Sequence, residues 1–121
     1  MARYVDGFVV PVPKKQVPAY LTMARKAGKI WREHGALEFR ECIADDVKPG
    51  KWTSFPQSVK LEKDEVVWFS WIVYKSRKDR DRINAKVMKD PRIKKMGPET
   101  MPFDGKRMVY GGFKTLVDLS G

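Results

Sequence analysis

Four stretches of the chain carry the apolar patterns of β-strands, namely residues 4–12, 36–45, 65–74 and 107–119. Residues 36–45 alternate between apolar and polar positions, as in a strand with one buried face, and Glu41 lies on the apolar side. Residues 65–74 are β-branched or aromatic on both faces, which predicts a central strand. Pro11 and Pro13 end the first stretch, because proline cannot donate to a strand ladder.

Residues 15–34 carry helical rather than strand periodicity. Five residues at helical spacing form one apolar stripe: Val17, Leu21, Ala24, Gly28 and Trp31. Pro18 is compatible with a helix because it falls in the first turn. Arg32 and His34 followed by Gly35 form a stop signal, with cations near the carbonyl end and then a residue free to turn left-handed.

A second helix is predicted to begin at Ser76. Asp79 follows three residues later and completes a capping box. Ile83 and Val87 provide a narrow apolar stripe. At residues 90–91, aspartate followed by proline predicts a break and an immediate restart, with the aspartate as the new N-cap.

The segment between the second and third strands has loop chemistry. Residues 46–57 contain three turn-forming positions, Pro49, Gly50 and Pro56. Trp52 and Phe55 make this loop unusually apolar, so we expect it to pack down as a flap. Residues 58–62 are predicted to extend a neighbouring strand, and Lys63-Asp64 to form a tight turn.

The predicted order is strand, helix, strand, strand, helix, strand. This βαββαβ order is that of a ferredoxin-like α+β domain: a four-stranded antiparallel sheet with both helices on one face. The other face carries tryptophan and phenylalanine from the strands and has no cover. Because a large uncovered apolar face usually marks an interface, we predict that two copies pair through it as a homodimer.

Length and composition agree with one globular domain spanning residues 1–121. Hydrophobic residues make up 42% of the chain and charged residues 33%. The single cysteine, Cys42, favours a reducing compartment and is predicted to be a small core residue. Without an apolar run of roughly 20 residues, neither export nor membrane insertion is expected, and the predicted location is cytoplasmic.

The net charge of +10 is concentrated in one segment. Residues 75–95 contain ten bases and three acids. This segment is either the wet face of a helix or a binding surface for nucleic acid or another polyanion. In the second interpretation the polyanion-binding candidates within 77–95 are Arg77, Lys78, Arg80, Lys86 and Lys89. Nucleic acid is not the favoured partner, because no ribonucleoprotein-like signature occurs and the sheet face is the predicted dimer face.

Four segments resemble a known bacterial family: residues 4–10, 69–72, 90–92 and 101–113. They read YVDGFVV, FSWI, DPR and MPFDGKRMVYGGF, and the last is long enough to be specific. They are similar to the uncharacterised YbaA-like family, a domain of unknown function in the dimeric α/β-barrel superfamily. The resemblance implies this barrel-forming dimer. It implies no activity, no cofactor and no catalytic residue.

Three residues are candidate acid–base groups. Asp6 lies within the first strand between aromatic residues, so its carboxylate must be hydrated, paired or protonated. It is either a general base or, the favoured alternative, one partner of an ion pair with a strand arginine such as Arg107. Glu41 poses the same question. A cavity shared with Asp6 would couple the two carboxylates and raise one pKa, but the favoured alternative is that the two lie at adjacent exposed edges. Tyr110 would border any such cavity.

Five residues are candidate ligand-binding groups: Asp104, Arg107, Gly111, Gly112 and Trp71. An arginine can hold a carboxylate or phosphate through two parallel hydrogen bonds, although Asp104 is favoured as a turn former. Glycines within strands indicate either a β-bulge or the close approach of another group. With one histidine (His34) and one cysteine there is no zinc-type cluster, so no metal site is predicted.

We therefore expect an uncharacterised protein of one of three classes. The first is a small-molecule-binding protein or cofactor-independent enzyme with a pocket between sheet and helices. The second is a binder of RNA or another polyanion through the basic helix, and the third is a structural or regulatory dimer without a ligand. Whether any reaction is catalysed is left open, and no cofactor is predicted.

Overall fold

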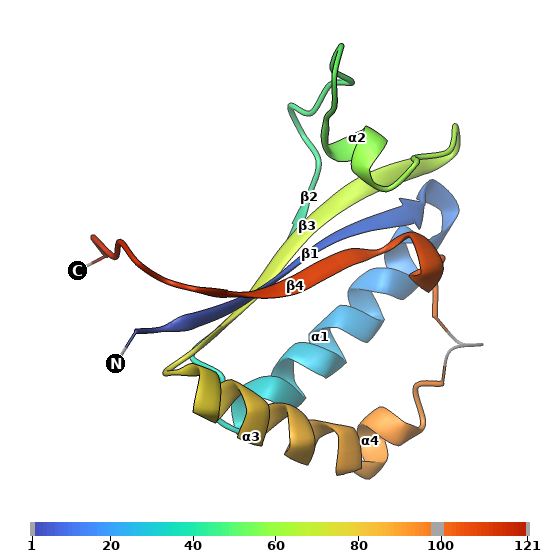
Figure 1. Cartoon of the computed structure of the whole chain (residues 1–121). Helices are drawn as coiled ribbons and strands as arrows, with labels where there is room; N and C mark the ends of the chain where they lie inside the picture. The colour runs from blue at the N-terminus through green and yellow to red at the C-terminus, as the bar shows by residue number, and fades with distance from the viewer. Residues whose placement is uncertain (1, 98–100, 121) are drawn as a thin grey trace.

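The computed structural model describes residues 2–97 and 101–120. Its main elements follow the predicted order: β1 (Tyr4–Pro13), α1 (Val17–Glu33), β2 (Glu38–Ile43), β3 (Glu65–Tyr74), α3 (Arg77–Lys89) and β4 (Val109–Lys114). The strands form one antiparallel sheet in the order β2-β3-β1-β4. Helices α1 and α3 both lie on one side of this sheet (Figure 1). The ferredoxin-like α+β fold and the central position of β3 are thus confirmed.

Short elements in the connections correct three expectations. Residues 58–62 do not extend a strand; Ser58 is the last residue of α2 (Phe55–Ser58), and a turn follows it directly. Ser54 caps α2, since its Oγ accepts from the Gln57 amide at 3.2 Å. The last strand stops at Lys114 rather than continuing to residue 119, because its ladder with β1 ends at Tyr4 and is followed by one further bond, from the Thr115 amide to the Arg3 carbonyl at 3.0 Å. In the predicted flap Phe55 packs edge-on against Phe69, whereas Trp52 is 84% exposed.

The helix boundaries follow local capping chemistry. Ser76 caps α3, since its Oγ accepts from the Asp79 amide at 3.1 Å. Asp90 caps the short helix α4 (Pro91–Lys94) through the Arg92 amide at 2.9 Å, so the predicted break and restart is confirmed. At the end of α1, Gly35 adopts a φ of +120°, a left-handed conformation that favours glycine.

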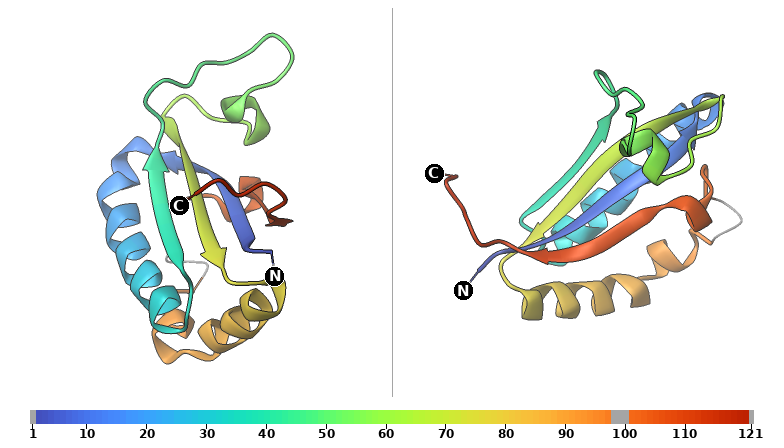
Figure 2. Two further views of the ribbon diagram at one scale, coloured as in Figure 1. Left: turned by 90° about the vertical axis from the view of Figure 1, so that its left-hand side faces the viewer. Right: turned by 45° about the horizontal axis from the view of Figure 1, so that its top comes forward.

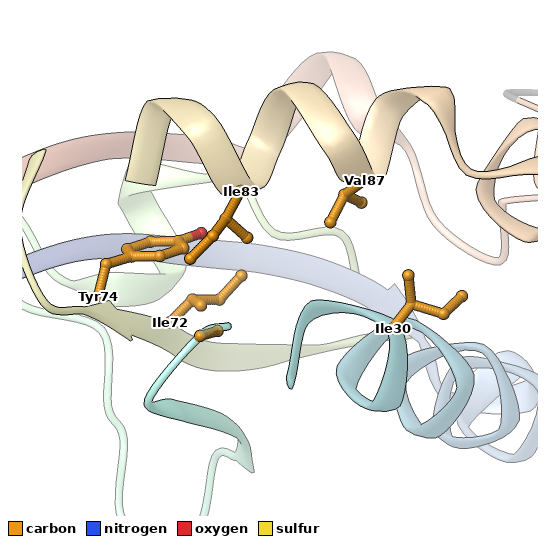
Figure 3. Close-up of a cluster of buried hydrophobic side chains, with 6 residues drawn as sticks. Ile30, Ile72, Tyr74, Ile83 and Val87 are labelled. Carbon is orange, nitrogen blue, oxygen red and sulfur yellow. The ribbon is translucent and has the colours of Figure 1, made fainter. Parts of the chain in front are cut away.

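The core lies between the sheet and the two long helices. One cluster joins Ile30 of α1, Ile72 and Tyr74 of β3, and Ile83 and Val87 of α3 (Figure 3). A second cluster, between the other end of the sheet and α1, consists of Val10, Val12, Tyr20, Ala24 and Trp68. The narrow stripe predicted for α3 is therefore fully buried.

One glycine sets the distance between α1 and β2. A Cβ atom at Gly28 would lie 2.7 Å from the Phe39 ring, well inside van der Waals contact. Phe39 therefore packs directly on the helix backbone. The predicted apolar stripe of α1 includes Gly28. This residue contributes to packing because it has no side chain, which leaves room for Phe39.

The opposite face of the sheet has no long helix over it. Figure 2 shows the strands with α1 and α3 on one side and only the short helix α2 on the other. We call this the open face; its apolar side chains come from alternate positions of β1, β3 and β4: Val5, Val9, Phe69, Trp71, Val73, Val109 and Phe113. Cys42 also lies on the open-face side of β2 and is exposed, so its predicted place in the core is wrong.

Candidate ligand-binding cavity

A cavity of about 650 Å³ lies between the sheet and helices α1, α3 and α4. Its volume is within the range of small-molecule sites. Most of its wall is aromatic or sulfur-containing, and these side chains are Phe8, Tyr20, Trp31, Phe39, Phe103, Tyr110, Met23, Met88, Met96, Met101 and Met108. Polarisable methionine side chains adapt to varied ligand shapes.

The strand register places the polar groups of the cavity floor in two rows. Glu41, Ser70, Phe8 and Tyr110 are successive neighbours across β2, β3, β1 and β4. The adjacent row includes Asp6, which pairs with Ile72 on one side and Gly112 on the other. Both rows face the helices because they occupy alternate positions of each strand.

At one end of the cavity, Glu41 is held by a tyrosine from α1. The Tyr20 hydroxyl donates to Glu41 Oε1 at 2.8 Å. Burial raises the pKa of Glu41, and the hydroxyls of Tyr20 and Ser70 only partly oppose this increase. Burial, together with the Glu41 carboxylate, also raises the pKa of Tyr20, so the tyrosine keeps its proton. Glu41 is therefore a hydrogen-bonded carboxyl group whose charged form is disfavoured.

At the other end, Asp6 is neutralised by Arg80 of α3. Arg80 Nε donates to both Asp6 carboxylate oxygens, at 3.0 and 3.1 Å, and Nη2 lies 3.0 Å from Oδ1. The Asp6 side chain is 10% exposed and the Arg80 side chain 22%. The pKa of Arg80 is raised by these hydrogen bonds, so it keeps its charge. The favoured ion-pair interpretation of Asp6 agrees with this geometry, but the predicted partner, Arg107, was wrong.

An amide bridges the helices to the sheet beside this ion pair. Asn84 Oδ1 accepts from Trp31 Nε1 at 3.0 Å and from the Tyr74 hydroxyl at 3.2 Å. Burial and the nearby Asp6 carboxylate raise the pKa of Tyr74. The network fixes α1 and α3 relative to β3, so this end of the cavity is rigid and its polar groups are already satisfied.

Arg107 and Asp104 line neither the cavity nor the open face. Arg107 donates to Glu65 Oε1 at 2.7 Å and to Asp104 Oδ2 at 3.0 Å, and its side chain is 17% exposed. The Arg107 guanidinium lowers the pKa of Glu65. Asp104 Oδ1 also accepts from the Lys106 amide at 3.0 Å, which fits its predicted role as a turn former. Both groups act structurally in this geometry.

The strand glycines form no bulge, and the close approach of other groups accounts for Gly112 alone. Gly7 pairs with Gly111 and Asp6 with Gly112 in an unbroken register. A Cβ at Gly112 would lie 2.5 Å from Arg80 Nη2 and 2.6 Å from the Tyr4 ring, so this glycine makes room for the arginine. Gly7 and Gly111 lie side by side on the open face.

Tyr110 and Trp71 connect the two sides of the sheet. Tyr110 is 70% exposed, stacks on Phe8 with ring centroids 6.3 Å apart, and lines both the cavity and the open-face groove. The Trp71 ring lies on the open face, with Nε1 3.5 Å from Glu38 Oε1. The structure therefore brings Asp6, Glu41 and Tyr110 to one cavity, rather than placing the two carboxylates at exposed edges as favoured above, while the five ligand-binding candidates are dispersed.

Comparison with known proteins settles the family. The family described as "Protein of unknown function (DUF1428)" matches residues 3–105. The chain belongs to the DUF1428 family. Uncharacterized protein YbaA of Escherichia coli K12 and its counterpart in Shigella flexneri are each 54% identical over 116 residues, which is 96% of this chain and 98% of YbaA. A crystal structure of a dimeric ferredoxin-like protein from an uncultured marine organism superposes with a TM-score of 0.68 at 7% identity, covering 98% of this chain and 100% of that one.

Outside the cavity, we examined this DUF1428 chain for metal ligands, membrane-spanning helices and free basic residues. Within the described residues no group of three metal-ligating side chains occurs, and no helix is long and apolar enough to cross a bilayer. His34 Nε2 lies 3.0 Å from Asp90 Oδ2, which joins the end of α1 to the start of α4. Of the polyanion-binding candidates, Arg80 is committed to Asp6, and Arg77 lies 3.7 Å from Asp81; Lys78, Lys86 and Lys89 are exposed.

Four residues of the DUF1428 cavity were missed as site residues. Tyr20 lies beside the predicted apolar stripe of α1. Ser70 is a polar residue within the apolar run of β3, and this interruption was the one sequence signal for it. Arg80 is predicted from the sequence only as a polyanion-binding candidate of the basic helix, and not as a cavity residue. Asn84 has no distinguishing sequence pattern, because its role depends on two side chains from other elements.

Proposed function

We propose that this protein binds a small, largely apolar molecule in the cavity between its sheet and its helices. The observation that supports this most is a space of about 650 Å³ with aromatic walls and a hydrogen-bonded carboxyl group, Glu41, on its floor. Such a combination of apolar wall and few polar groups is typical of ligand sites.

The test is occupancy of the cavity by an uncharged fluorescent probe, N-phenyl-1-naphthylamine. We expect its emission to rise on binding, and Ala27→Trp to abolish the rise, because Ala27 lines the cavity and a larger side chain fills it. Ala85→Trp is the matched control, since Ala85 is exposed on α3 and does not line the cavity. Absence of binding to the unaltered protein, or equal binding to both variants, would contradict the proposal.

We propose further that the protein is a homodimer joined through the open face. The groove on this face, about 690 Å³, is lined almost wholly by apolar groups, including Phe69, Val73 and Phe113. Exposed apolar patches of this kind are typical of protein interfaces. The superposed marine protein is described as dimeric, which supports self-association of this fold. Analytical ultracentrifugation at micromolar concentration tests it, and a monomer there would contradict it.

The same cavity is compatible with cofactor-independent catalysis as the finer form of this proposal. Of the three acid–base candidates, Glu41 is the best placed, because Asp6 is neutralised by Arg80 and Tyr110 lies at the rim.

The exposed lysines of α3 support polyanion binding as a second candidate function. Gel shifts with RNA and DNA test it, and binding should weaken steeply with salt. We still expect a cytoplasmic location, because the chain has a single cysteine and so no internal disulfide.

A further inference from the structure

Glu41 differs from the other charged groups around the cavity in having no cation beside it. Within the described part of the chain no lysine, arginine or histidine lies within ion-pair distance of its carboxylate. Its near partners, the hydroxyls of Tyr20 and Ser70, are neutral. In a chain of net charge +10, an unpaired carboxyl group in a cavity is unexpected.

Each of the other charged groups of the cavity wall has a partner of opposite charge. Asp6 and Arg80 form a pair with three contacts at 3.0–3.1 Å. Arg40, which borders the cavity, lies 3.4 Å through its Nε from Glu38, which lies outside the cavity. When ionised, Glu41 is therefore the one charged group lining the cavity, among the described residues, that has no ion-pair partner.

The walls near Glu41 suit a cation as well as an apolar group. Phe8 lies two strands away in the same row as Glu41, and Phe39 precedes it on the same face of β2. Tyr20 and Phe103 form an edge-to-face pair with centroids 5.8 Å apart. The faces of such rings attract positive charge through their quadrupoles.

We propose that the ligand of this cavity is a hydrophobic ammonium compound, an arylalkyl- or alkylamine whose protonated nitrogen pairs with Glu41 and whose apolar body lies among the aromatic side chains. This inference rests on the proposed function, because it names the chemistry of a ligand for the same cavity. Burial disfavours the ionised form of Glu41 in the empty cavity, and a bound cation would reverse that effect.

The experiment compares three competitors of N-phenyl-1-naphthylamine at pH 7 that share a phenylethyl body and differ in the charge of the terminal group. These are 2-phenylethylamine, which is a cation, 2-phenylethanol, which is neutral, and 3-phenylpropionate, which is an anion. We expect the amine to displace the probe at a concentration at least about 10-fold lower than the alcohol, and the anion to be the weakest. Glu41→Gln should reduce the preference for the amine over the alcohol to about 2-fold or less, with each competitor measured relative to the variant's own affinity for the probe.

Asp104→Asn is the matched control, because this carboxylate lies outside the cavity and its loss should leave the amine preference unchanged. Equal displacement by amine and alcohol would overturn the inference while leaving the proposed function standing. Preference for 3-phenylpropionate would also overturn it and indicate Arg80 as the anchor. If the Glu41→Gln variant does not fold, the three competitors on the unaltered protein still decide the question.

Discussion

The two faces of the sheet are made from alternate residues of the same four strands, yet they are built differently. The helix-covered face carries Asp6, Glu41 and Ser70 among its apolar groups, and each of these polar groups has a partner. The open face is apolar at nearly every central position. A buried polar group needs a fixed partner, which only a covering element supplies. This difference underlies our two proposals, a ligand at the covered face and a second copy of the chain at the open face.

The neighbouring glycines of β4 repeat this difference on a smaller scale. Gly112 faces the helices, and its missing side chain is filled by Arg80 and Tyr4. Gly111 faces outward, where only the Phe113 ring comes within 4 Å, and at Gly7 beside it nothing does. The space on the covered face is thus filled within the subunit. The space on the open face is left for a group from outside it.

The largest expected effect is on the covered face. Arg80→Ala leaves the Asp6 carboxylate buried and unpaired, so the free energy of unfolding should fall by about 3 kcal/mol, measured by urea denaturation. Arg77→Ala on the same helix is the control, because that side chain is 71% exposed, and its effect should stay within about 0.5 kcal/mol. Equal effects of the two substitutions would mean that the ion pair is not important for stability.

A charge on the open face should act on association instead. Phe69→Glu places a carboxylate in the apolar groove and should raise the dimer dissociation constant at least about 100-fold, or about 2.7 kcal/mol, as measured by sedimentation. Trp52→Glu adds the same charge at an exposed loop position outside the groove and should leave the dimer intact. A dimer that tolerates Phe69→Glu must be formed by another surface.

The two adjacent glycines allow a matched comparison within one strand. Gly112→Ala should lower the free energy of unfolding by about 2 kcal/mol, because its Cβ would clash with Arg80 and the Tyr4 ring. Gly111→Ala should change it by less than about 1 kcal/mol, since the nearest atom, in the Phe113 ring, is 3.7 Å away. Thermal unfolding of both variants at one concentration decides whether the covered face is the tightly packed one.

The smallest effect expected is a gain in stability. Glu41→Gln retains an acceptor for Tyr20 and removes a buried charge, so it should raise the free energy of unfolding at pH 7 by about 1 kcal/mol. Because the folded protein holds the Glu41 proton more tightly than the unfolded chain, the gain should be absent below the ordinary carboxyl pKa and grow as pH rises through the interval up to the raised folded pKa. A gain that is constant from pH 3 to 8 would contradict this origin.

Much of the fold was predictable because its signals are local. The uniform β character of Glu65–Tyr74 identified the central strand, and Ser76 and Asp90 identified two helix starts. The end of β4 was not predictable from its own residues, because the alternation of residues 107–119 continues beyond the point where β1 provides a partner. Strand length here is a property of the pairing and not of the segment.

The candidate site was only partly predictable for a related reason. Asp6 and Glu41 are conspicuous as acids within strands, and both line the cavity. Their partners, Arg80 and Tyr20, lie 74 and 21 residues away in the sequence. Both come from helices, for which the hydrophobic pattern predicts only an apolar stripe and an exposed face. Periodicity assigns a residue to a face of its own element. It does not indicate which residue of another element lies opposite.

The contact between Gly28 and Phe39 has a practical consequence for anyone who alters this protein. In most helices, replacing glycine with alanine is a safe way to gain thermal resistance. Here an added methyl group would meet the Phe39 ring at 2.7 Å, and that ring is part of the cavity wall. Position 28 therefore controls the cavity from a distance. A bulkier residue there would move the Phe39 ring and narrow the cavity, which would change the size of ligand accepted without any substitution of a lining residue.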